Sequence, residues 1–270
     1  MKNCWICGSE DLSDEHKFKS SDMRKYGKHY KNDKAMFYIR GNEKHSVESY
    51  KSDLLKFKKI ICRECNNVRT QTHDYAYDVL SKYIDKDNYT KLVDKRLIDF
   101  EDIFGVDWRT EKANLYRYYA KHAGCKIATS NKPHDLKEIS DFILEKQNSI
   151  TSFKLHFQLK EAIKILNEKQ DNYWHLYNGS TFFIKENDDS YTFSGWISYQ
   201  WLSVNWVMSS KITTAKKADL NRKQEQLSLK SIEEYSPFPQ DFTSFITQVE
   251  TEGIEDIQSR IKFIESIIDS

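Results

Sequence analysis

The stretch CRECNN, residues 62–67, contains the second of two Cys-x-x-Cys pairs, and the first pair is CWIC at residues 4–7. Two such pairs separated by a long segment are typical of a structural Zn²⁺ site, in which four thiolates surround the ion and leave no open position. A redox-active Cys-x-x-Cys is the alternative, but redox chemistry needs one pair rather than two. We therefore predict one zinc ion with four ligands, which are Cys4, Cys7, Cys62 and Cys65.

The remaining cysteine and the hydropathy of the chain indicate its compartment. Cys125 has no partner at ligand spacing, and we expect it to be buried as a small hydrophobic residue. Five cysteines with four in close pairs fit a reducing compartment better than a disulfide framework. No apolar run approaches the ~18 to 20 residues of a membrane span, and the N-terminus lacks the apolar core of a signal peptide. We expect a cytoplasmic protein that does not enter a membrane.

Charge is unevenly distributed along the 270 residues, although the net charge is only +1. Residues 1–72 contain 16 Lys and Arg against 10 Asp and Glu, and the rest of the chain contains 26 against 31. Positive charge beside the cysteines favours binding of a polyanion, because Lys and Arg that face phosphates release condensed counterions. The alternative is a solvated, lysine-rich surface.

The hydrophobic pattern of the first third of the chain predicts two strands followed by a helix. Apolar residues fall near alternate positions in residues 35–41 and 54–62, as in half-buried strands. After Cys65 the spacing becomes helical, and Thr72 is the expected N-cap. These elements define an expected N-terminal unit, residues 1–94.

The rest of the chain, residues 95–270, is predicted to be mainly helical with a small antiparallel sheet. The expected helices include one that begins at Thr110 and ends near Gly124, and further ones at 134–147, at 152–170 and after residue 240. The expected strands lie within 172–213. The predicted fold class is therefore α+β with two domains.

The motifs CWIC, SDEH (13–16), ICRECNN (61–67) and RTQTHD (69–74) together resemble the HNH endonucleases, or ββα-metal nucleases, in the subgroup with two Cys-x-x-Cys pairs. The resemblance covers roughly residues 1–85. It implies a zinc-braced unit of two strands and a helix that hydrolyses phosphodiester bonds, with DNA as the expected substrate.

The same resemblance implies a role for each matching residue. Glu15 and Asn66 would bind one catalytic divalent ion, Mg²⁺ or Mn²⁺, and His16 would be the general base. An imidazole with its ordinary pKa of ~6.5 can take a proton from water at neutral pH, and Mg²⁺ prefers hard oxygen ligands. Asp is commoner than Glu at the acidic position, so Asp14 is the alternative metal ligand.

Three polar residues after the last cysteine are candidates for contact with nucleic acid, namely Arg69, Gln71 and His73. Ordinary capping and surface roles are the alternative for them. Residues 95–270 would supply target recognition, a homodimer interface or a surface for a partner protein. By analogy, proteins of this build often act in restriction, phage defence or mobile elements.

A second class of function is also compatible with the cysteines and lysines. A zinc-knuckle protein could bind nucleic acid or act as a regulator without any catalysis. Nucleic-acid binding alone does not require an acid, a histidine and an amide in one site. The Glu15-His16 pair together with Asn66 therefore favours the nuclease.

Overall fold

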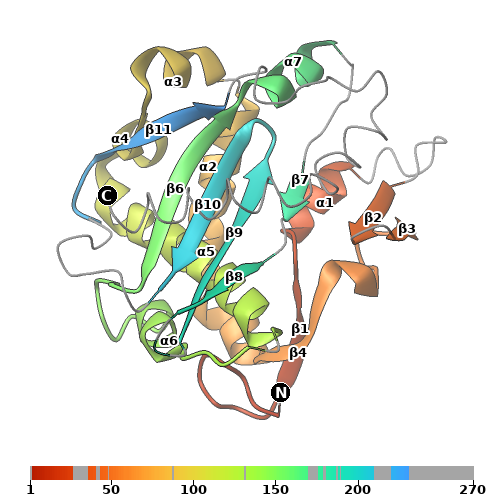
Figure 1. The fold of residues 1–270 in the computed structure, drawn as a ribbon. Coiled ribbons are helices and arrows are strands. Elements are labelled where there is room, and N and C mark those ends of the chain that lie inside the picture. The colour runs from red at the N-terminus through yellow and green to blue at the C-terminus, as the bar shows by residue number, and fades with distance from the viewer. Residues whose placement is uncertain are drawn as a thin grey trace. The chain divides into compact units, whose positions relative to one another are not determined.

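The computed structural model describes residues 2–26, 36–40, 43–47, 49–86, 88–130, 132–169, 176–178, 181–186, 188, 190–209 and 220–230. The chain divides into two compact units. The first comprises Met1–Glu15 with Phe57–Lys230, and the second comprises His16–Lys56 with Ser231–Ser270. Helices and strands are mixed along the chain, which confirms the predicted α+β class (Figure 1).

A seven-stranded sheet forms the centre of the first unit, with the strand order β5-β11-β6-β10-β9-β7 and with β8 paired to β9. The bounds of its strands are β5 Leu97–Asp99, β6 Phe153–Lys160, β7 Leu176–Asn178, β8 Phe182–Lys185, β9 Tyr191–Tyr199, β10 Leu202–Met208 and β11 Gln224–Lys230. The sheet is antiparallel except where β11 runs parallel to β6. Gly195 pairs with Trp206, and a Cβ at Gly195 would lie only 2.5 Å from that fully buried ring, so the sheet needs glycine there.

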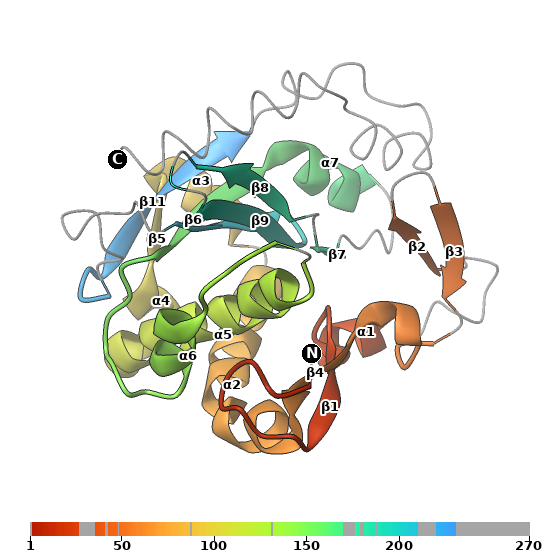
Figure 2. The same ribbon diagram turned by 60° about the horizontal axis from the view of Figure 1, so that its bottom comes forward.

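Helices cover one face of this sheet (Figure 2). They are α2 Gln71–Asp85, α4 Phe100–Phe104, α5 Trp108–Ala128 and α6 Lys137–Ile143, while α3 Tyr89–Lys95, the 3₁₀ turn η3 Gly105–Asp107 and α7 Glu161–Lys169 lie in the connections. Tyr77 of α2 stacks on Tyr118 of α5 with ring centroids 4.3 Å apart, and Tyr199 of β9 donates a hydrogen bond to Asp85 of α2 at 2.6 Å. The helices and the sheet therefore share one core.

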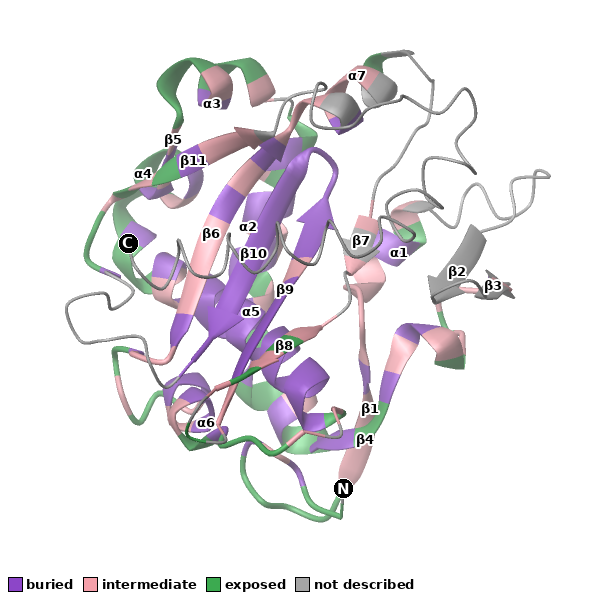
Figure 3. Cartoon of the chain, in the orientation of Figure 1, coloured by how far each residue is buried: buried purple, intermediate pink, exposed green. Residues whose placement is uncertain are grey.

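Helix α5 lies at the centre of that core. Every residue from Asn114 to Ala128 is buried, and Figure 3 shows the helix coloured as buried along most of its length. The helix nevertheless carries four buried cations, and three of them, Lys112, Arg117 and Lys121, have carboxylate partners. A charge inside a protein requires such a partner, so α5 is held by ion pairs as well as by apolar packing.

A strand pair lies next to helix α2 in the chain. Strand β1 (Leu12–His16) pairs with β4 (Lys56–Cys62), and backbone hydrogen bonds from Arg63 to Asp11 and from Lys17 to Leu55 show that the two strands run antiparallel. A short π-helical turn, η2 (Cys65–Arg69), leads from β4 into α2. The predicted strand at 54–62 and the predicted helix after Cys65 correspond to β4 and α2, but the predicted strand at 35–41 forms a separate hairpin, and the hydrophobic pattern did not indicate β1.

The described part of the second unit is small. It contains α1 (Ser20–Tyr26), the hairpin of β2 (Met36–Arg40) with β3 (Glu43–Val47), and the 3₁₀ turn η1 (Asp53–Leu55).

Several sequence predictions need correction. The predicted helix at 152–170 is wrong in its first half, because Phe153, Phe157 and Leu159 are buried in β6 and only residues from Glu161 onward are helical. Helix α5 does not end near Gly124 but continues to Ala128. The sheet is also larger than the predicted one, since strands outside 172–213 join it. The expected helices after residue 240 lie outside the described residues.

The domain boundary expected near residue 94 does not coincide with the division into compact units. Residues 57–94 belong to the same unit as α5 and the large sheet, because α2 packs directly on α5. Within the described part of the chain, no helix combines the length and the apolar character that a membrane span requires.

Candidate functional site

The four predicted zinc ligands lie together in the first unit. Their sulfur atoms are all within 4.8 Å of one another, and those of Cys7 and Cys62 are 3.5 Å apart. A tetrahedral site with Zn–S bonds of ~2.3 Å places the sulfurs about 3.8 Å apart, so the cluster has the size that a metal ion requires. None of the four cysteines forms a disulfide bond. The prediction that they can share a metal ion is confirmed.

Local backbone geometry brings each pair of cysteines into position. The first pair is carried by a tight turn in which Gly8 donates to the Cys4 carbonyl at 2.8 Å, and Gly8 has a φ of +81° that favours glycine. The second pair spans the end of β4 and the start of η2, where the backbone N–H of Cys65 donates to the Cys62 sulfur at 3.3 Å. Such donors stabilise the thiolate form that binds metal.

The thiols also influence one another's ionisation. The hydrogen bond between Cys65 and Cys4 affects the two thiols in opposite directions. It lowers the pKa of Cys4 to about 4, and together with burial it raises the pKa of Cys65 above its usual range. Ionisation of one thiol in this cluster therefore makes ionisation of the next thiol less favourable. A bound cation would remove that opposition, so the cluster suits a metal ion better than four free thiols.

Asn66 is fixed against strand β1. Its side-chain amide donates to the backbone carbonyl of Asp14 at 2.9 Å and to the hydroxyl of Ser13 at 3.2 Å. Both amide hydrogens thus point to the strand. The remaining polar atom of the side chain, the carbonyl oxygen, is the one that can bind a cation.

Glu15 faces the interior of the first unit. Glu15 is 6% exposed, and its Oε1 lies 3.1 Å from the ammonium of Lys121 on α5. Burial alone would lower the pKa of Lys121, but Glu15 and Asp74 outweigh burial and raise it above its usual range. The candidate metal ligand is therefore already paired with a permanent cation.

Asp14, the alternative ligand, also has partners. Its carboxylate accepts from the backbone N–H of Lys59 and from the Lys58 ammonium, both at 3.1 Å. Burial opposes the ionised form, but these two donors lower its pKa below the ordinary value. Lys59 has a φ of 49°, so Asp14 helps to hold an irregular point in β4.

His16 is the last residue of β1 and follows Glu15 directly. It is half-buried and is the first residue of the second unit.

The three candidates for nucleic-acid contact have different surroundings. Gln71 is exposed, and the half-exposed Arg69 lies beside Glu64 at 3.6 Å. His73 is 0% exposed, so the expectation that it contacts nucleic acid does not fit this structure. Burial, together with the charges of Arg117 and Lys121, lowers the pKa of His73 to about 3, and the ring is a neutral core group at pH 7.

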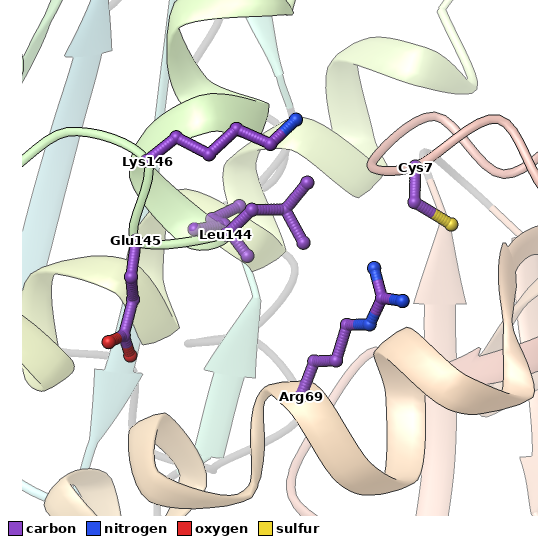
Figure 4. A pocket seen from close by; sticks show the side chains of 6 residues that line it. Cys7, Arg69, Leu144, Glu145 and Lys146 are labelled. Carbon is purple, nitrogen blue, oxygen red and sulfur yellow. The ribbon is translucent and has the colours of Figure 1, made fainter.

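Arg69 borders a cavity of about 440 Å³. The other residues that line it are Cys7, Ile143, Leu144, Glu145 and Lys146. Figure 4 shows the charged ends of Arg69 and Lys146 extending along this cavity from two separate segments, while the Glu145 carboxylate points away. Each of the two cations also has a carboxylate nearby, since Arg69 lies 3.6 Å from Glu64 and Lys146 lies 3.5 Å from Asp141.

No family model, curated protein or solved structure matches this chain. The functional assignment therefore depends on the chemistry of its own residues.

Sequence reasoning did not find Lys121 and Thr70 in the surroundings of Glu15. The ammonium of Lys121 lies 3.0 Å from Asp74 Oδ1 and 3.3 Å from the Thr70 hydroxyl. The available signal was a row of cations, Lys112, Arg117 and Lys121, within a helix otherwise rich in aromatic and small residues. Such a row indicates buried ion pairs, but it does not identify their partners.

Proposed function

We propose that this chain is a metal-dependent endonuclease of the HNH type that hydrolyses phosphodiester bonds of DNA. The observation that carries the proposal is the contact of Asn66 with Asp14, which places the amide after the last cysteine against the strand that continues into Glu15 and His16. The four close cysteines support it, because they tie the turn that precedes β1 to the residue that precedes Asn66. We infer that this structural ion is Zn²⁺.

Each residue has a defined task in this proposal. The His16 imidazole takes a proton from the attacking water, which becomes the nucleophile at phosphorus. The Asn66 carbonyl oxygen and one carboxylate, Glu15 or alternatively Asp14, provide hard oxygen ligands. The Mg²⁺ or Mn²⁺ bound there would polarise the phosphate and stabilise charge on the leaving 3′ oxygen. Arg69, with Lys146, is suited to hold a neighbouring phosphate.

The first test is cleavage of plasmid and of single-stranded DNA with Mg²⁺, with Mn²⁺ and with neither ion. Omission of the ion is a better control than EDTA, because EDTA also removes zinc. His16→Ala should bind nucleic acid and retain zinc as the parent does, but cleavage should fall by ~10²-fold or more, since only the proton transfer is lost. His134→Ala, at an exposed histidine, is the matched control and should cleave normally.

Asn66→Ala separates a metal defect from a proton-transfer defect. It should also lose cleavage, and raised Mn²⁺ should restore part of it, whereas His16→Ala should resist such rescue. If His16→Ala cuts as fast as the parent with the same need for a divalent ion, the HNH mechanism does not apply to this chain.

The second candidate function is nucleic-acid binding without cleavage, and the Glu15–Lys121 ion pair favours it, because that pair occupies a carboxylate that the nuclease needs. Such a protein would bind nucleic acid with a strong dependence on salt and would cut none of the substrates with either ion.

A further inference from the structure

The hydroxyl of Ser13 in β1 bonds both to strand β4 and to the turn η2. It donates to the backbone carbonyl of Ile61 at 3.1 Å, and it accepts from the side-chain amide of Asn66 at 3.2 Å. Ile61 comes directly before the third cysteine of the cluster, and Asn66 comes directly after the fourth. The cysteine cluster therefore holds both ends of this short chain of hydrogen bonds.

The polarity of these bonds fixes which way the Asn66 amide faces. A backbone carbonyl only accepts, so the single hydrogen of the Ser13 hydroxyl is used on Ile61. The lone pairs of that hydroxyl remain, and the amide group beside them has to be the donor, NH₂. The Asp14 carbonyl, 2.9 Å from the same nitrogen, selects the same orientation. The network thus decides between two amide atoms that have nearly the same shape.

This orientation leaves the amide oxygen for a cation. Both hydrogens of the NH₂ group have acceptors, and within the described part of the chain no donor bonds to Oδ1 of Asn66. If Ser13 lacked its hydroxyl, the amide would have one acceptor instead of two and would turn more freely. A turned amide presents N–H groups, which carry partial positive charge and repel a cation. Partners that fix a metal ligand in this way typically account for roughly 10- to 100-fold in metal affinity.

We propose that Ser13 is a positioning residue, which orients Asn66 so that the amide oxygen is presented to a divalent ion. The inference rests on the proposed function, in which that oxygen is a ligand of the catalytic Mg²⁺ or Mn²⁺. Ser13 itself does not bind the ion, because its hydroxyl is engaged by Ile61 and Asn66. Its effect should therefore appear in the affinity for the ion and not in the chemical step.

The orientation of the amide is tested without any divalent ion besides the zinc. In NMR spectra of protein with isotope-labelled asparagine, the NH₂ signals of Asn66 are identified by their loss in Asn66→Ala. Both hydrogens should exchange slowly with water in the parent, because each is bonded to an acceptor. In Ser13→Ala at least one should exchange several-fold faster, and Ser13→Thr, which restores a hydroxyl, should return to the rate of the parent. Equal exchange in the parent and in Ser13→Ala would overturn the proposal.

Ion binding is the second readout. In buffer that leaves the zinc in place, the parent should bind one Mn²⁺ per chain in equilibrium dialysis, and Ser13→Ala should bind it roughly tenfold more weakly. In cleavage, Ser13→Ala should need correspondingly more Mg²⁺ for the half-maximal rate but should approach the rate of the parent when the ion is saturating. A loss of rate that excess Mg²⁺ does not restore would contradict a positioning role.

Two comparisons separate positioning from a general loss of stability. Ser9→Ala is the matched control, because Ser9 is exposed and its hydroxyl accepts only from the backbone of Asp11, at 3.4 Å. It should bind Mn²⁺ as the parent does. In the background of Asn66→Ala, Ser13→Ala should have no further effect on Mn²⁺ affinity, since no amide remains to be oriented. Additive losses would show that Ser13 acts on the fold and not through Asn66.

If Ser13→Ala fails to retain its zinc, Ser13→Val and Ser13→Thr carry the same tests, because the two side chains have the same shape and only threonine has a hydroxyl. A parent that binds no Mn²⁺ beside the zinc and does not cleave would refute the proposed function, whereas the amide exchange would still decide whether Ser13 orients Asn66. A parent that binds Mn²⁺ and cleaves, together with a Ser13→Ala variant of equal Mn²⁺ affinity, would refute the positioning role alone.

Discussion

At the scale of single residues, the buried imidazole of His73 links the stability of the first unit to pH. The pKa of His73 in the folded chain is about 3, against an ordinary value of 6.5. The unfolded chain therefore binds more protons than the folded chain between these values. The contribution of neutral His73 to stability is complete above pH ~6.5 and is lost as the pH falls toward 3.

We predict that His73→Leu flattens this dependence. Between pH 6.5 and 5 the free energy of unfolding of the parent should fall, relative to the variant, with a slope that rises from about 0.7 to about 1.4 kcal/mol per pH unit as the imidazole of the unfolded parent becomes fully protonated. Urea unfolding at several pH values measures it. His134→Leu, at an exposed histidine, should leave the profile of the parent unchanged. Parallel profiles for parent and His73→Leu would contradict the prediction.

At the scale of secondary-structure elements, the turn that carries Cys4 and Cys7 packs against helix α5 through the ring of Trp5. The Trp5 indole packs with Phe57, Ile60 and Cys125. A Cβ at Gly124 would lie 2.2 to 2.8 Å from three carbons of that ring. Glycine in mid-helix is normally unfavourable, so its presence here is explained by the close approach of Trp5.

Gly124→Ala should therefore destabilise the protein by about 1–3 kcal/mol through overpacking, although alanine favours a helix. In the background of Trp5→Leu, which removes the ring, the same change should become neutral or stabilising. Thermal or urea unfolding of the parent, both single variants and the double variant gives the coupling energy. A destabilisation that is equal in both backgrounds would show that the ring is not the cause.

The same scale shows what sequence reasoning could and could not predict. Strand β4, helix α2 and each Cys-x-x-Cys pair follow from local spacing, and the meeting of the two distant pairs follows from the preference of Zn²⁺ for four thiolate ligands. Strand β6 was predicted as helix, because its apolar residues fit either period over a short segment, and only pairing with β10 and β11 decides between them. The partner of Glu15 lies on α5, more than a hundred residues away, and no local pattern specifies such a contact.

At the scale of the whole molecule, the cysteine cluster should decide whether the first unit folds. We predict one tightly bound Zn²⁺ per chain, measured by elemental analysis. Cys65→Ser should lose the ion and unfold this unit, because metal binding and folding are coupled in such sites. Circular dichroism, with zinc measured on the same sample, checks both outcomes.

Cys125→Ala is the matched control for this prediction. Cys125 is fully buried but lies outside the cluster, and burial raises the pKa of its thiol. The variant should keep its zinc and its fold with only a modest loss of stability. Well-folded parent protein without zinc would refute the assignment of the ion.

The pairing of β1 with β4 has a consequence for how this chain can change over time. The backbone N–H of Lys17 donates to the carbonyl of Leu55 at 2.8 Å. The two ends of the segment 18–54 are therefore held together by one backbone hydrogen bond. The entropy of closing a flexible loop grows slowly, by only ~0.6 kcal/mol for each doubling of its length. A change in the length of the segment between these two residues would therefore alter the closure entropy only slightly. Its main energetic effect would come from the packing of buried residues such as Met23 and Val47, not from the distance that the chain must span.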